Sequence, residues 1–138
     1  MFKKLNKKGF TLAELLIVVA IIGVLVAISI PIFTSQLEKA REAVDLSNIR
    51  AAYAECSADV LTNSSAAGYY EKVDVKQQTD SWVSSPDKIA GTLDVTNDPV
   101  GSKLGKTNKT VYVNVSKDGA FTLTTEPAAD FVDVTTVK

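Results

Sequence analysis

The feature of this sequence that most constrains its fold is an apolar run near the amino terminus. No charged residue occurs from position 15 to position 33. At about 1.5 Å per helical residue the run forms a helix of roughly 29 Å, close to the thickness of the hydrocarbon core of a bilayer. We therefore expect residues 10–33 to form a helix that spans a membrane or packs in an apolar bundle of helices.

The residues in front of this run set its orientation. Four lysines precede it, at positions 3, 4, 7 and 8. Basic residues beside a membrane helix stay on the cytoplasmic side, so the carboxyl-terminal part of the chain is expected to face outward. Without these four lysines, 11 of the 15 basic residues remain against 16 acidic ones. A surface for nucleic acid that depends on bulk positive charge is therefore not expected.

A single acid, Glu14, lies one helical turn after Phe10 at the edge of the apolar run. An ionised side chain costs about 2.5 to 3.5 kcal/mol at mid-bilayer on insertion scales, so Glu14 requires a place near the interface or a partner. If the bond between Gly9 and Phe10 were cut, the new α-amino group of Phe10 would lie on the same helical face as Glu14. The sequence leaves open whether such a pair forms within one helix or between two chains.

The residues Lys7-Lys8-Gly9-Phe10-Thr11-Leu12-Ala13-Glu14-Leu15, followed by the apolar helix, resemble the class III signal of type IV pilins. The resemblance covers about the first quarter of the chain, and Ala13 stands where many relatives carry a larger aliphatic residue. It implies that a prepilin peptidase cuts after Gly9 and that the amino terminus of Phe10 is methylated. It also implies that related subunits pack their apolar helices into a filament, where Glu14 meets the amino terminus of a neighbour.

Two simpler interpretations compete with this one. An ordinary secretory signal peptide also has basic residues before an apolar region, but it needs a small-residue cleavage site, and it does not explain Glu14. A plain membrane anchor explains the lysines and the apolar run but leaves Gly9, Phe10 and Glu14 without a role.

Gly23 and Pro31 are the two weak points of the apolar helix. Proline removes a backbone hydrogen bond and glycine is a poor helix former, although both are common in membrane helices. The pilin resemblance implies that the segment between them loses helical structure in filaments. A gentle kink is the alternative.

After the apolar run the chain is expected to form a head at residues 34–138. Its helical half, residues 34–62, has apolar residues at steps of three to five and acids such as Glu38, Glu42 and Asp45 between them, so the apolar ones are expected to face the core. The expected core-facing stripe is Leu37, Ala40, Val44, Ile49, Tyr53, Cys56 and Val60.

The rest of the head is expected to consist of a loop at residues 63–109 and a sheet at residues 110–138. Residues 92–95 suggest one short strand in the loop. Residues 111–115 alternate valine with polar residues, a turn at residues 117–119 follows, and residues 121–124 and 131–135 form further strand candidates. The expected fold is α+β, with an antiparallel sheet of three to four strands on the second half of a long helix. Residues 1–9 are the expected leader, removed on maturation.

The side chains offer little for catalysis or metal binding. The sequence has no histidine and one cysteine, Cys56, so an internal disulfide and a thiolate zinc site are excluded. Many Gram-negative pilins close a carboxyl-terminal loop with a disulfide, so its absence suggests a Gram-positive origin. The remaining candidates for a special role are the cation loop Asp94, Asn97 and Asp98, the glycosylation triplets at Asn108 and Asn114, and Trp82, and the ordinary roles of loop residue or core anchor are favoured for all of them.

The expected function is that of a type IV pilus subunit with no enzymatic activity, cofactor or metal. The precursor would lie in the cytoplasmic membrane, with the peptidase and an assembly platform as partners, and the mature subunit in an extracellular fimbrium. A pseudopilin of a secretion or competence machine and a membrane-anchored binding module are the alternatives. The sequence does not distinguish adhesion, motility and DNA uptake.

Overall fold

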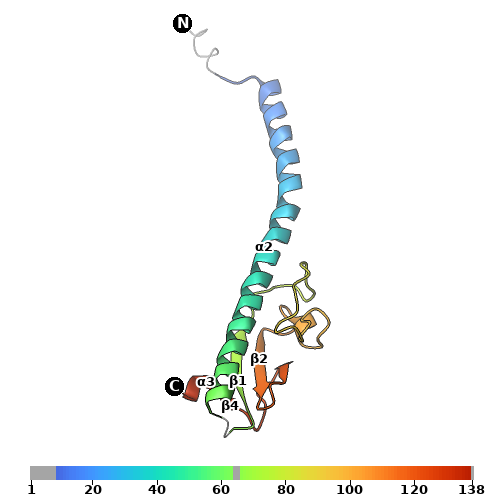
Figure 1. The fold of residues 1–138 in the computed structure, drawn as a ribbon. Helices are drawn as coiled ribbons and strands as arrows, with labels where there is room; N and C mark the ends of the chain where they lie inside the picture. The colour runs from blue at the N-terminus through green and yellow to red at the C-terminus, as the bar shows by residue number, and fades with distance from the viewer. Residues whose placement is uncertain (1–8, 64–65, 138) are drawn as a thin grey trace. The chain divides into compact units, whose positions relative to one another are not determined.

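The computed structural model describes residues 9–63 and 66–137. Its largest element is the helix α2, Leu12–Thr62, 51 residues long (Figure 1). The chain divides after Gln36 into two units, residues 1–36 and 37–138, and α2 contributes to both. The long amino-terminal helix expected from the sequence is confirmed.

The first unit contains the apolar part of α2. Pro31 lies inside the helix and does not end it, although its ring nitrogen cannot donate to the preceding turn. The hydroxyl of Thr34 donates to the carbonyl oxygen of Pro31 at 3.0 Å, and that of Ser29 donates to Leu25 at 2.7 Å. These two hydroxyls thus find backbone acceptors within their own helix.

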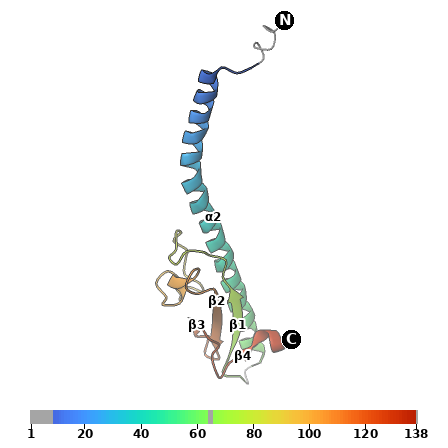
Figure 2. The same ribbon diagram turned by 180° about the vertical axis from the view of Figure 1, so that it is seen from behind.

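The second unit is a four-stranded sheet against which residues 37–62 of α2 pack (Figures 1 and 2). The strand order is β3-β2-β1-β4. β1 pairs with β2 and β2 with β3 in antiparallel fashion, whereas β4 runs parallel to β1. The strands are β1 (Gly68–Asp74), β2 (Thr110–Ser116), β3 (Phe121–Thr124) and β4 (Val132–Asp133), and the last is followed by the short helix α3 (Val134–Val137).

The predicted α+β fold and four-strand count are confirmed, but the sheet is mixed and not purely antiparallel. β4 pairs with β1 at Tyr69 and Tyr70, on the side of β1 opposite to β2, and it runs in the same direction as β1. The predicted strands at residues 111–115 and 121–124 are present. Gly119, at φ +86°, forms the turn between them, where a residue with a side chain would be strained.

The segment expected as a loop, residues 63–109, contains the strand β1. This strand was missed because Glu71 occupies one of its inward positions and so breaks the apolar alternation. The strand predicted at residues 92–95 is wrong. There the chain forms a turn closed by one bridge between Ile89 and Leu93, followed later by the 3-10 helix η1 (Gly101–Lys103).

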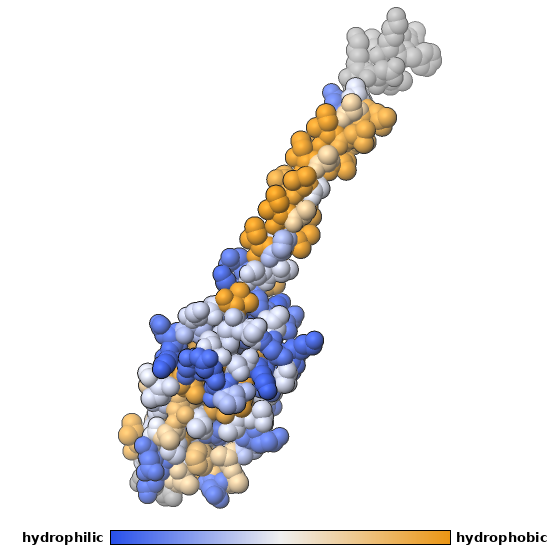
Figure 3. All heavy atoms as spheres, turned by 90° about the vertical axis from the view of Figure 1, so that its right-hand side faces the viewer, coloured by the Kyte–Doolittle hydropathy of each residue, from blue (hydrophilic) through white to orange (hydrophobic). Residues whose placement is uncertain are grey.

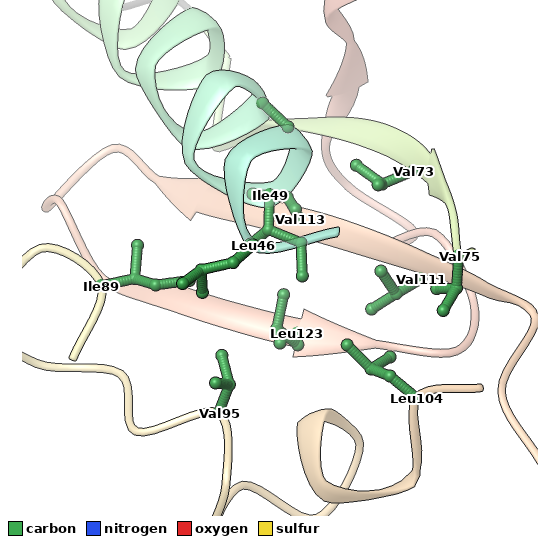
Figure 4. Packing of buried hydrophobic residues seen from close by; sticks show 11 residues of the cluster. Leu46, Ile49, Val73, Val75, Ile89, Val95, Leu104, Val111, Val113 and Leu123 are labelled. Carbon is green, nitrogen blue, oxygen red and sulfur yellow. The ribbon is translucent and has the colours of Figure 1, made fainter. Parts of the chain in front are cut away.

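The core lies between residues 37–62 of α2 and the inner face of the sheet (Figure 4). Leu46 and Ile49 of α2 face Val113 and Leu123 of the sheet, and the loop residues labelled in the figure close the side of the cluster. The buried loop residues are Ile89, Val95 and Leu104. The long connection therefore completes the core that the small sheet could not build alone.

The face that α2 turns toward the head differs from the predicted stripe. Ile49 and Cys56 are fully buried, and Tyr53 and Val60 are partly buried, as expected. The first three members of the stripe are exposed, and the buried positions between residues 38 and 45 are Glu38, Glu42 and Asp45. The predicted stripe is therefore wrong in its first two turns.

The three buried acids hold the chain segment that follows β1. Asp45 accepts the N–H groups of residues 76 and 77 at 2.7 and 2.8 Å, and Glu38 accepts those of residues 78 and 79 at 2.8 and 3.1 Å. Glu42 accepts the N–H groups of Val83 and Ser84 and the Ser84 hydroxyl. We call Glu38, Glu42 and Asp45 the carboxylate row. It replaces a strand partner for this segment, because backbone N–H groups at a buried position need acceptors.

Candidate processing and assembly segment

The bond predicted to be cut lies just outside the helix. Gly9 and Phe10 precede α2, which begins at Leu12, and both are exposed, Phe10 to 87%. A peptidase needs an extended backbone at the bond that it cuts, and an intact helix would hide that backbone. The fold therefore leaves this bond open to an enzyme.

Glu14 takes part in a reciprocal cap at the start of α2. The Thr11 N–H donates to a Glu14 carboxylate oxygen at 2.9 Å, and the Glu14 N–H donates to the Thr11 hydroxyl at 3.2 Å. This is a capping box, which satisfies two N–H groups that the first turn leaves without helical acceptors. In the uncleaved chain Glu14 thus has a partner within its own helix.

Sequence reasoning missed this cap, although its signal was present. The pattern of Thr11 followed three residues later by Glu14, directly before an apolar run, is the usual mark of a capping box. The carboxylate also lies at the positive end of the helix dipole, where acidic side chains are common. Only one of the two carboxylate oxygens of Glu14, Oε2, takes part in the cap.

The apolar part of α2 is exposed on all sides within its unit. The large side chains from Leu15 to Phe33 are between 46 and 68% exposed. Figure 3 shows this part as a nearly continuous apolar surface. Among the described residues, one helix, α2, is both long enough and apolar enough to cross a membrane. A surface of this kind requires lipid or protein around it.

Gly23 lies in this exposed part, and a Cβ added there would have no other atom within 4 Å. No contact within the chain therefore explains a glycine there. A shallow apolar groove runs over Ala20, Ile21, Val24 and Leu25 beside it. The predicted roles of Gly23 and Pro31 in helix flexibility stay predictions.

The other candidates from the sequence have ordinary places in the head. Burial raises the pKa of the Cys56 thiol to about 12, and its sulfur lies 3.7 Å from the Val113 carbonyl oxygen, so it is a poor nucleophile at neutral pH. The Trp82 ring N–H donates to the Gly101 carbonyl oxygen at 3.0 Å, and the ring packs on the core. The expected roles of buried side chain and core anchor are confirmed.

The acidic loop and the two triplets are engaged in the same way. The Asp94 carboxylate accepts from the Thr96 hydroxyl and the Asn97 amide, and these bonds keep the pKa of Asp94 below its usual value. The amides of Asn108 and Asn114 donate to Val100 and Thr124. Within residues 9–63 and 66–137 no group of three His, Cys, Asp or Glu side chains is placed to hold a metal ion.

Comparison with known proteins gives a match at the amino terminus. The family model described as "Prokaryotic N-terminal methylation motif" matches residues 4–30. The chain carries this methylation motif. It spans the Gly9–Phe10 bond, the capping box and most of the apolar run. No solved structure matches the chain.

Three curated relatives are similar over short stretches. Fimbrial protein EcpB of Eikenella corrodens is 54% identical over 36 residues, 26% of this chain and 23% of that protein. Type IV major pilin protein PilA of Myxococcus xanthus is 48% identical over 48 residues, 35% of this chain and 22% of that protein. Type IV narrow pilus major component PilA5 of Thermus thermophilus is 49% identical over 53 residues, 36% of this chain and 46% of that protein.

The match thus spans less than half the length of each of these relatives. The matched stretches cover 26 to 36% of this chain, so most of the chain lies outside them. The relatives lend no support to the Gram-positive origin that the missing disulfide suggested.

Proposed function

We propose that this chain is the precursor of a structural subunit of a type IV pilus. The observation that carries the proposal is the methylation motif, whose Gly9–Phe10 bond lies exposed shortly before α2, a helix with a charge-free and exposed stretch at residues 15–33. The three relatives, a fimbrial protein and two pilus components by name, favour a pilus over a pseudopilus. The role is structural and not catalytic.

The proposed maturation follows from the place of the motif. A prepilin peptidase in the cytoplasmic membrane removes residues 1–9 and methylates the amino group of Phe10. The domain division follows from it: residues 10–33 anchor the precursor and later form the filament core, and residues 34–138 form the exposed head. Identical or related subunits and an assembly platform are the remaining partners, and the mature subunit lies in an extracellular fimbrium.

Glu14 is proposed to select the place of each incoming subunit. Moving an apolar helix from lipid into a bundle gains little hydrophobic free energy, so a polar contact has to choose the register. After cleavage, the Phe10 amino group of a neighbour offers a cation for the carboxylate, and an ionised acid in an apolar bundle needs such a partner. The Thr11 contact holds the carboxylate until then.

Mass spectrometry of sheared surface fibres tests the processing. The expected subunit begins at Phe10 and carries one methyl group. A surface protein that retains residues 1–9 would refute it.

The pairing is tested by Glu14→Gln, which keeps the size of the side chain and one oxygen acceptor but removes the charge. We expect normal cleavage after Gly9, a folded head and a sharp loss of filaments in electron micrographs. Abundant filaments of the cleaved Gln variant would show that the charge pair is not needed, while the pilus assignment could stand.

A further inference from the structure

The strand β1 has an edge that no strand covers along its second half. On one side β1 pairs with β2 along its whole length. On the other side β4 pairs with it at Tyr69 and Tyr70 only, and among the described residues no strand pairs with the rest of β1 there. We call residues 71–74 on this side the open edge. Backbone groups that point out of such an edge can pair with another strand.

The backbone groups that point out of the open edge belong to Lys72 and Asp74. Ala67 and Val75, which flank β1, form backbone hydrogen bonds with the residues that flank β2, at 2.9 and 2.8 Å. Successive residues of a strand point their N–H and C=O groups to opposite sides, so the odd-numbered residues of β1 bond to β2. The even-numbered residues point away from β2. Tyr70 is one of these and meets β4, whereas Lys72 and Asp74 meet no strand.

A hollow of about 310 Å³ lies at the open edge, between β1 and α2. It is lined by Asn48 and Ala51 of α2, by residues 71–74 of β1 and by Lys76. Neighbouring strands of a sheet lie about 4.8 Å apart, so a strand added to the open edge would run beside this hollow. Every second side chain of that strand would point toward α2, where Asn48 and Ala51 are exposed.

The residues that follow β4 do not occupy the open edge, although they run toward it. Because β4 is parallel to β1, an extended continuation would place residues 134–137 beside the open edge. These residues form α3 instead. The Asp133 carboxylate accepts the Thr135 N–H and hydroxyl at 2.9 and 2.7 Å, and Val134 is fully buried in a cluster with Cys56. These contacts keep the end of the chain in α3 and leave the open edge free.

We propose that the open edge binds an extended segment of a partner protein, which joins the sheet as a strand beside β1. The N–H and C=O groups of Lys72 and Asp74 match the backbone of an extended peptide, whose own groups alternate at the same spacing. β4 already binds the first half of the same edge in this way. The site lies wholly within residues 37–138, so the binding does not depend on the proposed assembly.

The lining of the hollow indicates which kind of segment fits. Its charges balance, since Lys72 and Lys76 are basic and Glu71 and Asp74 are acidic. Neither sign of charge is favoured, so the segment is expected to be uncharged. Ala51 has a short side chain and leaves room for apolar side chains of the partner. Valine and threonine favour the extended conformation, so a segment rich in them is expected to bind best.

Peptide binding to the full chain in micelles of a nonionic detergent tests the proposal. The probe is the fluorescein-labelled synthetic peptide Ser-Thr-Val-Thr-Val-Thr-Ser, followed by fluorescence anisotropy with empty micelles as the blank. The control peptide has the same side chains but carries N-methyl groups on two adjacent central residues, which blocks both edges of the strand. We expect the control peptide to bind about tenfold more weakly, because it loses a hydrogen bond and cannot approach β1 closely. Equal binding of the two peptides, or no binding of the probe at millimolar concentration, would overturn the proposal.

A matched pair of variants at Lys72 locates the binding. Lys72→Pro removes the N–H that points out of the open edge and leaves the hydrogen bonds between β1 and β2 in place. Lys72→Ala removes the side chain and keeps the N–H. We expect the proline variant to bind the probe about tenfold more weakly and the alanine variant to bind it as the original chain does. Equal affinities of the two variants would contradict the proposal.

Ala51→Phe tests the hollow without changing β1, and it applies even if circular dichroism shows that Lys72→Pro does not fold. Ala51 is exposed on α2, and a phenylalanine there fills the space into which the side chains of the probe would point. We expect weaker binding of the probe. Unchanged binding would place the peptide elsewhere and overturn the proposal.

A second copy of this chain is the alternative occupant, and sedimentation of the full chain in micelles distinguishes it. We expect Lys72→Pro and Lys72→Ala to leave the size of the particles unchanged. Assemblies that the proline variant dissolves and the alanine variant keeps would show that copies of the chain pair through the open edge. That result would overturn the proposal and leave the pilus function intact.

Discussion

Replacing Glu42 by glutamine is the sharpest test of how the head holds its long connection. Glu42 is 1% exposed and accepts the backbone N–H groups of Val83 and Ser84, together with the Ser84 hydroxyl. In Glu42→Gln one carboxylate oxygen becomes an NH₂ group. The NH₂ group cannot accept a hydrogen bond. In either orientation of the amide it faces a donor, which is the Val83 N–H at one position and the Ser84 N–H and hydroxyl at the other.

The size of the effect follows from these contacts. A hydrogen bond to a charged group contributes about 1.5 to 3 kcal/mol, and a buried donor left without an acceptor costs about 1 to 3 kcal/mol. The glutamine variant loses one of the two acceptor oxygens of Glu42, so we expect the free energy of unfolding to fall by about 2 to 3 kcal/mol. For a unit of about 100 residues this corresponds to a decrease in Tm of about 8 to 20 °C.

Trp82 provides the assay, because it is the only tryptophan and its neighbour Val83 binds Glu42. Urea unfolding followed by its fluorescence reports on the segment that the row holds. Glu126→Gln is the control, since Glu126 is exposed and such surface changes stay within about 0.5 kcal/mol. If the Glu42 and Glu126 variants unfold at the same urea concentration, the carboxylate row does not hold the connection.

Three further predictions concern the head. A fragment that begins at Thr34 should be folded, soluble and monomeric, since it lacks the apolar anchor; an unfolded fragment, judged by circular dichroism, would contradict the proposed division of the chain. Burial raises the pKa of Glu38, but the N–H groups of residues 78 and 79 and the Arg41 and Thr79 side chains outweigh it and hold the pKa below 4.5. The ionised Glu38 carboxylate therefore stabilises the head above the pKa that Glu38 has in the unfolded chain, and this stabilisation is lost as the pH falls through its pKa in the folded chain. In urea titrations, the destabilisation caused by Glu38→Gln should accordingly vanish below the pKa of Glu38 in the folded chain. Gly68→Ala should cost about 1 to 3 kcal/mol in the same titrations, because its Cβ would lie 2.6 Å from the Phe131 ring and the Val115 carbonyl oxygen; unchanged stability would show that Phe131 moves aside freely.

Two members of the carboxylate row, Glu38 and Asp45, have pKa values shifted in opposite directions. Burial raises the pKa of Asp45, the N–H groups of residues 76 and 77 and the Lys76 charge oppose this, and the nearby Glu38 carboxylate adds to the rise. The raised pKa means that ionised Asp45 costs stability at neutral pH, while Glu38 supplies it. The row thus stabilises the head through the backbone groups that it satisfies, and the charge of Glu38 adds to this while the charge of Asp45 opposes it.

The local features of this protein could be predicted from its sequence. A charge-free run of this length admits a membrane or bundle helix, and the leader, Gly9, Phe10 and Glu14 mark its front edge. The valine alternation at residues 111–115 and the turn at Gly119 determine a hairpin, because strand periodicity and a positive φ are properties of a few adjacent residues.

Only the tertiary structure decided which way the head half of α2 faces. By themselves, Glu38, Glu42 and Asp45 are expected in water, since burying an ionised carboxylate is costly without donors. The donors are backbone N–H groups that lie more than 30 residues later in the chain, and no local sequence pattern predicts these contacts. Because these contacts turn the face with the acids toward the head, Leu37, Ala40 and Val44 of the predicted stripe are left exposed. The direction of β4 was likewise decided by its pairing with β1, far away in the sequence.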